Sequence, residues 1–289
     1  MHTLSDSCLN PKTSHEHPSY ARLRDSDDWE MRKRRDYICG LLSHHRKSFP
    51  AKFDTDLQHS LPQSMYELVL LNILATVFPE RLTTDEKNAG PDFCVCGKVW
   101  IEAVVPKCGK GNGMDSLPAA RMNTVRPHPD QQAALRIVNV LSGKREKLNS
   151  DTWQKIIGKK DCFVIAVACS DLGDVGLSKA DFDLALFGVG PAEIDVKAKR
   201  YIGNSTIPHF SKNNEKLVDM GLFFSRKFES VSAVLASPTN TIFPEISDHI
   251  LYINPAATNP LPECFREPFS LRICSAKIDG GYTLTNKKK

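Results

Sequence analysis

Three stretches of the chain have the hydrophobic patterning of helices. Residues 64–78 are apolar nearly all round, which predicts a buried helix with Glu67 as its only charge. Residues 27–47 place acids in the first turn, bases towards the end and a thin apolar stripe between them, which predicts a half-buried helix. Residues 129–148 repeat apolar side chains on one face, at spacings suited to packing on a sheet.

Other stretches have the patterning of strands. Residues 161–170 form a continuous apolar run of strand length, which predicts a strand covered on both faces. Residues 90–109, GPDFCVCGKVWIEAVVPKCG, predict a hairpin that turns at Gly97-Lys98. Two further strands are expected within residues 228–236 and 249–254. Helices and strands in this order predict a mixed α/β core.

The predicted hairpin brings two acids together. Pairing across Gly97-Lys98 sets Glu102 opposite Phe93 and diagonally beside Asp92, at roughly 7–8 Å between Cα atoms. Acids inside apolar strands need a partner, because burying an unpaired charge is costly. Two carboxylates at this separation can share one cation, so a divalent metal is the candidate partner.

The same residues carry a resemblance. Pro91-Asp92, followed by Glu102 in the segment IEAVVP, resembles the PD-(D/E)XK nuclease superfamily. More narrowly, WIEAVVPKCG is similar to the IEA-V-x-P segment of uncharacterised bacterial proteins placed near that superfamily. One position departs from the superfamily pattern, because the lysine expected two residues after the acid is Val104 here.

The resemblance implies a restriction-endonuclease-like fold, a mixed sheet flanked by helices, over residues 60–289. Residues 1–59 are then a tail and a helical extension, with no order expected up to about Asp25. The implied activity is metal-dependent hydrolysis of phosphodiester bonds in nucleic acid. Asp92 and Glu102 would hold Mg²⁺ or Mn²⁺.

Glu67 has two interpretations. The resemblance implies that it joins the metal site, because many superfamily members contribute an acid from a helix that precedes the core strands. Alternatively, Ser64 and Glu67 form a capping box at the start of the helix. The two roles do not exclude each other.

The missing strand lysine has candidate replacements. Some superfamily members carry the catalytic lysine on the helix after the acidic strand, and Lys144 is the first candidate for that role. Arg136 and Lys147 lie on the same flank and are candidates for binding phosphate. Lys107, just past the strand, is the second candidate. The alternative is an ordinary flank of basic side chains with solvated ends.

The composition limits the class of protein, its partners and its location. The chain has 289 residues, 41% hydrophobic and 25% charged, with a net charge of +4, so no strongly basic surface argues for nucleic acid by itself. Nine cysteines lie mostly in apolar runs, typical of buried thiols in a reducing compartment. No signal peptide and no membrane span are apparent, so a cytoplasmic location is expected.

Competing functions remain. A zinc site at Cys94, Cys96 and Cys108 lacks a completing ligand pair. Residues 107–129 are rich in glycine and proline and are expected to form a lid or a substrate-facing loop. The alternative to an enzyme is an inactive nuclease-fold protein that binds nucleic acid or a protein partner, and the missing strand lysine favours it. A Lys144 amine within roughly 4–7 Å of the Asp92 and Glu102 carboxylates favours the enzyme, whereas the inactive module predicts a lysine that points away from the acids.

Overall fold

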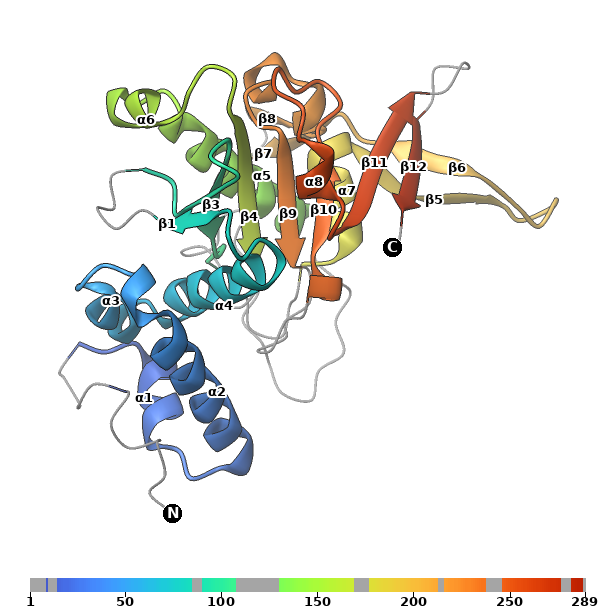
Figure 1. Ribbon diagram of the computed structural model, residues 1–289. Coiled ribbons are helices and arrows are strands. Elements are labelled where there is room, and N and C mark those ends of the chain that lie inside the picture. The colour runs from blue at the N-terminus through green and yellow to red at the C-terminus, as the bar shows by residue number, and fades with distance from the viewer. Residues whose placement is uncertain are drawn as a thin grey trace.

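A mixed eight-stranded sheet forms the centre of the computed structural model, with helices on both faces (Figure 1). The structure describes residues 9, 15–84, 90–107, 130–168, 177–212, 216–237, 246–276 and 282–287. In spatial order the strands are β1 (Leu82–Thr84), β2 (Phe93–Val95), β3 (Val99–Val104), β4 (Cys162–Ala168), β9 (Ala233–Ser237), β10 (Ile250–Ile253), β11 (Ser270–Ala276) and β12 (Tyr282–Lys287).

The middle of the sheet is parallel, and nearly all of its residues are buried. Strand β4 pairs in parallel with β3 on one side and with β9 on the other. All seven residues of β4 are buried, as the apolar run in the sequence predicts. The outer pairs β1–β2, β2–β3, β9–β10 and β11–β12 are antiparallel, and β10–β11 is parallel.

Helices cover both faces. One face of the sheet shares an apolar cluster with α5 and α7, and the other shares a cluster with α4 and α8. The α-helices are α1 (Pro18–Asp25), α2 (Trp29–His45), α3 (Phe53–His59), α4 (Leu61–Val77), α5 (Asp130–Lys147), α6 (Asp151–Ile156), α7 (Lys179–Phe187) and α8 (Glu263–Arg266). No helix within the described ranges is long and apolar enough to cross a membrane.

The N-terminal helices pack together against α4. A third apolar cluster joins side chains of α1, α2 and α3 to one side of α4, whose other side faces the sheet. Residues 18–25 were expected to lack structure, but they form α1, because Tyr20 and Leu23 are buried in this cluster. The extension is therefore an ordered layer that reaches the sheet through α4.

Two short hairpins lie outside the main sheet. They are β5 (Val189–Asp195) with β6 (Arg200–Thr206), and β7 (His209–Lys212) with β8 (Lys216–Asp219). The first projects well beyond β11 and β12 (Figure 1). Short 3₁₀ turns occupy Arg46–Ser48, Leu222–Phe224, Arg226–Phe228 and Ile246–Asp248.

The cysteines only partly match the expectation of buried thiols. Cys94, Cys162 and Cys274 are buried free thiols, whereas Cys264 is exposed. Cys39, on α2, is disulfide-bonded, which corrects the expectation for that residue. Spacing along the chain gives no signal for this bond, because a disulfide depends on the separation of two Cα atoms in space.

Candidate active site

The β2–β3 hairpin turns one residue earlier than expected. The turn is centred on Cys96 and Gly97, both with positive φ (56° and 64°), and Lys98 N–H donates to the Val95 carbonyl at 3.2 Å. A turn of this kind needs positive φ at both central positions, so Gly97 takes the second place and not the first. The prediction of a turn centred on Gly97-Lys98 is therefore wrong.

This shift changes the register of the two acids. Phe93 pairs with Ile101, not with Glu102, and the same register carried back one residue sets Asp92 opposite Glu102. Asp92 Oδ2 accepts a hydrogen bond from the Ala103 N–H at 2.7 Å, which continues the ladder through a side chain. The two acids lie at the start of β2 and near the end of β3, closer together than the diagonal arrangement placed them.

Glu102 is a buried acid held by two lysines. It is 3% exposed, and Lys144 Nζ lies 2.6 Å and Lys147 Nζ 2.9 Å from Glu102 Oε1. The lysines are three residues apart on α5, so both amines reach the same side of the helix. The side chain of Lys144 is 18% exposed and that of Lys147 is 50% exposed. Lys144 is therefore the more enclosed cation.

The other predicted cations are not paired with Glu102 in the described chain. Arg136, two turns before Lys144 on α5, is half-buried and takes no part in the ion pairs that Glu102 forms within the described chain. Lys107 is exposed, three residues past the end of β3. Most of the predicted loop at 107–129, and Cys108 with it, lies outside the described residues.

Glu67 faces the hairpin from α4. Its carboxylate accepts a hydrogen bond from Gln63 Nε2 at 2.8 Å, one helical turn earlier. The capping-box interpretation is wrong, because α4 already begins at Leu61 with Pro62 in its first turn, which leaves Ser64 inside the helix. Glu67 is therefore directed at the sheet and not at the helix start.

Burial and mutual repulsion both raise the pKa of two of the acids. Burial raises the pKa of Asp92 well above its ordinary value, and the charges of Glu102 and Glu67 raise it further. Burial also raises the pKa of Glu67, with added repulsion from Glu102 and Asp56, although the hydrogen bond from Gln63 and the charge of Lys144 oppose the rise. Burial and repulsion thus shift both Asp92 and Glu67 towards the protonated form.

Gln63 is a residue that the sequence analysis missed. Its Nε2 also donates to the Ala103 carbonyl at 3.1 Å, and its Oε1 accepts from the Val105 N–H at 2.9 Å. One side chain thereby ties α4 to the end of β3 and orients Glu67. The only signal in the sequence is its position four residues before Glu67, which puts both on one helix face.

Replacing Gln63 with leucine is expected to lower the free energy of unfolding by about 1–3 kcal/mol, because it leaves the Ala103 carbonyl and the Val105 N–H without this partner. Urea denaturation followed by circular dichroism measures this change. Thr76→Ala is the control, because Thr76 is an exposed residue of the same helix. Equal stability of Gln63→Leu and the wild type would contradict the role of Gln63 in tying α4 to the end of β3.

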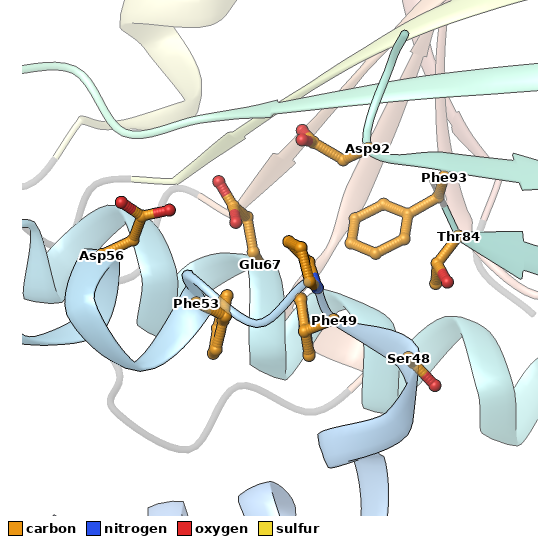
Figure 2. A pocket seen from close by; sticks show the side chains of 9 residues that line it. Ser48, Phe49, Phe53, Asp56, Glu67, Thr84, Asp92 and Phe93 are labelled. Atoms are coloured by element: carbon orange, nitrogen blue, oxygen red, sulfur yellow. The ribbon is translucent and has the colours of Figure 1, made fainter. Parts of the chain in front are cut away.

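A small cavity lies beside Asp92 and Glu67. It has a volume of about 30 Å³, enough for one or two water molecules or a single ion. Figure 2 shows the carboxylates of Asp56, Glu67 and Asp92 around it, with the ring of Phe93 below Asp92. Asp56 comes from α3, and no pattern in the sequence connects it to the hairpin. The N-terminal extension thus supplies part of the cavity wall.

The oxygen ligands that the acids and the Ala103 carbonyl offer suit a hard divalent cation. Carboxylate oxygens and the Ala103 carbonyl are the ligand types that Mg²⁺ and Mn²⁺ prefer. Cys94 is a poor ligand, because burial raises the pKa of its thiol to about 11. Among the described residues, however, no group of three or more His, Cys, Asp or Glu side chains is arranged to hold a metal ion. The acids therefore suit a cation chemically without forming a ready-made cage.

Comparisons with known proteins found no relative of this chain. No protein-family model matches the chain, and no match was found among curated proteins or among solved structures. The candidate site is therefore argued from its own geometry.

Proposed function

We propose that the protein is a metal-dependent nuclease of the restriction-endonuclease-like kind, with its acids on the β2–β3 hairpin and its lysine on α5. The observation that carries the proposal is the contact of 2.6 Å between Lys144 Nζ and Glu102 Oε1. Position 104, where the superfamily pattern expects a lysine, is valine and is buried. Lys144 on α5 thus reaches β3, the strand that carries Glu102 but has no lysine at position 104.

The order of elements supports the same fold. A helix that carries Glu67 precedes the antiparallel hairpin with Asp92 and Glu102, a helix with Lys144 follows, and β4 then pairs in parallel with β3. This is the order that the resemblance to the PD-(D/E)XK superfamily implies for its core. Four separate elements bring polar groups to one end of β3.

Each residue has a role in the proposed chemistry. Asp92, Glu102 and Glu67, with the Ala103 carbonyl, would hold Mg²⁺ or Mn²⁺. A bound ion of this kind lowers the pKa of an attacking water and stabilises charge on the phosphate. Lys144 donates a hydrogen bond to the water or to the phosphate oxygens as their negative charge grows. Lys147, Arg136 and Lys107 would neutralise neighbouring phosphates.

A second candidate function is an inactive nuclease-fold module that binds nucleic acid or a protein partner. The observation that favours it is the buried valine at position 104, which leaves β3 without the lysine of the superfamily pattern. A site in which the lysines neutralise the acid permanently needs no metal. This candidate predicts nucleic-acid binding without cleavage.

Incubation with labelled single- and double-stranded DNA and RNA, with Mn²⁺, Mg²⁺ or a chelator, tests the proposal. The expected result is cleavage that needs the metal and is absent in Glu102→Gln, while Asp151→Asn retains it. Asp151 is an exposed acid of α6 and serves as the matched control. Binding of any of these substrates without cleavage, under every metal condition, would support the inactive module instead.

A further inference from the structure

A buried tryptophan lies beside the lysines of the candidate site. Trp153 is 7% exposed and is the only buried residue of α6. Its ring packs edge-to-face on the ring of Phe163 in β4, with 5.8 Å between the two centroids and 64° between the ring planes. Close packing of this kind keeps a side chain in one rotamer. Trp153 therefore offers a fixed ring to the side chains beside it.

Lys147 contacts both this ring and Glu102. Its Nζ lies over the ring of Trp153, 5.4 Å from the centroid, which is within the range of a cation–π contact. The same amine lies 2.9 Å from Glu102 Oε1. Tryptophan has the ring that attracts a cation most strongly. The position of the lysine amine is thus defined by a carboxylate and by an aromatic ring.

The turn between α5 and α6 ties the tryptophan to the lysine. The Ser150 hydroxyl donates a hydrogen bond to the Lys147 carbonyl at 2.8 Å, and its Oγ accepts one from the Trp153 N–H at 3.4 Å. The Ser150 N–H also donates to the Lys147 carbonyl, at 3.0 Å. One residue thereby links the backbone of Lys147 to the backbone of Trp153, so local hydrogen bonds help to set the distance from the ring to the amine.

Lys147 needs a second contact more than Lys144 does. Its side chain is 50% exposed, whereas that of Lys144 is 18% exposed. A half-exposed ion pair is weak, because water screens the charges and the lysine gains rotamer freedom when it leaves. The ring adds a contact without adding a negative charge, so it does not reduce the attraction of Lys147 for a phosphate.

We propose that Trp153 is a positioning residue that holds the amine of Lys147 beside Glu102, where the amine meets a backbone phosphate next to the scissile one. The phosphate rests on the proposed function, whereas the contact between ring and lysine does not. Loss of Trp153 then weakens nucleic-acid binding through Lys147, and leaves the contact between Lys144 and Glu102 in place.

A double-mutant cycle in the full chain tests this role. Binding of labelled DNA and RNA is measured in a chelator, where no cleavage occurs. Trp153→Leu and Lys147→Gln are each expected to bind about three- to tenfold more weakly than the wild type. The double variant should bind no more weakly than Lys147→Gln alone, because the ring acts only through the lysine. Losses that multiply in the double variant would overturn the proposal.

Two further variants separate positioning from general loosening of the core. Trp153→Phe keeps an aromatic ring in the same place and should recover part of the lost binding. Phe228→Leu removes a buried ring of the same apolar cluster, and should leave binding unchanged. Equal losses in Phe228→Leu and Trp153→Leu would make the effect of Trp153 merely structural and overturn the proposal.

Nuclear magnetic resonance of the lysine side chains tests the contact without nucleic acid and without a core variant. The ring current of Trp153 should shift the Hε protons of Lys147 upfield from those of the other lysines, and the shifted signal should be absent in Lys147→Gln. An unshifted signal in a wild type that cleaves nucleic acid would overturn the role of Trp153 alone. A shifted signal in a wild type that neither binds nor cleaves nucleic acid would contradict the proposed function, and the phosphate contact with it.

Discussion

Replacing Asp92 with asparagine is expected to make the protein more stable at neutral pH while abolishing metal-dependent cleavage. The asparagine oxygen still accepts the hydrogen bond from the Ala103 N–H, and the charge that Glu102 and Glu67 repel is gone. A raised pKa in the folded protein means that ionised Asp92 weakens folding, so a gain in the free energy of unfolding is expected. Urea denaturation in the presence of a chelator measures it.

The pH dependence of this gain has a definite sign. The pKa of Asp92 is raised on folding, so ionised Asp92 destabilises the folded protein at every pH above its folded pKa. As the pH falls through the folded pKa, the folded protein takes up the proton and the penalty declines. The advantage of Asp92→Asn should therefore vanish below the ordinary value of 3.8 and grow as the pH rises above it.

Two outcomes would contradict this account of Asp92. One is a variant less stable than the wild type at neutral pH without metal, which would mean that the carboxylate already has a stabilising partner. The other is an equal gain in Asp151→Asn, the exposed control, which would make the effect unspecific. Retained cleavage in Asp92→Asn would remove this residue from the proposed site.

Replacing Lys144 with glutamine is expected to lower the cleavage rate by about 10²–10³-fold, the usual effect of removing one donor that stabilises developing charge. Lys147→Gln is the matched control, because it removes the other lysine of the same carboxylate. Its effect should be below about tenfold, since its side chain is half exposed and its charge is better screened by water. Single-turnover cleavage kinetics of both variants, with circular dichroism to check folding, measure the difference.

Comparing the two lysine variants also shows which results would contradict the proposed role of Lys144. Either single variant leaves Glu102 one ion pair, so loss of folding does not explain an activity difference between them. Equal losses in the two variants would mean that the lysines only neutralise Glu102. Full activity in Lys144→Gln would exclude it as the replacement for the strand lysine.

The long elements could be predicted from the sequence because their patterns are strong. The helices around Glu67 and Lys144 and the buried strand β4 lie where the apolar periodicity placed them. Lys144 and Lys147 could be expected on one flank because they are three residues apart. Their contact with Glu102 needs the packing of α5 on the sheet, which periodicity alone does not give.

The errors have physical causes. The hairpin register was displaced because Cys96, not a glycine, adopts positive φ, which residue preferences disfavour. The β5–β6 hairpin was missed because its strands face solvent on both sides and lack the alternation of a half-buried strand. Asp56 reaches the cavity through the fold of the N-terminal helices, so its role depends on contacts between distant segments.

The central claim is that Asp92, Glu102 and Glu67 together bind a divalent cation. Calorimetric titration of Mn²⁺ and Mg²⁺ into the wild type, Asp92→Asn and Glu102→Gln at near-neutral pH tests it most directly. The account predicts binding to the wild type, with proton release from the carboxyls of raised pKa, and loss of binding in both variants. A folded wild type that binds neither metal would contradict the account, and the acids would then be structural.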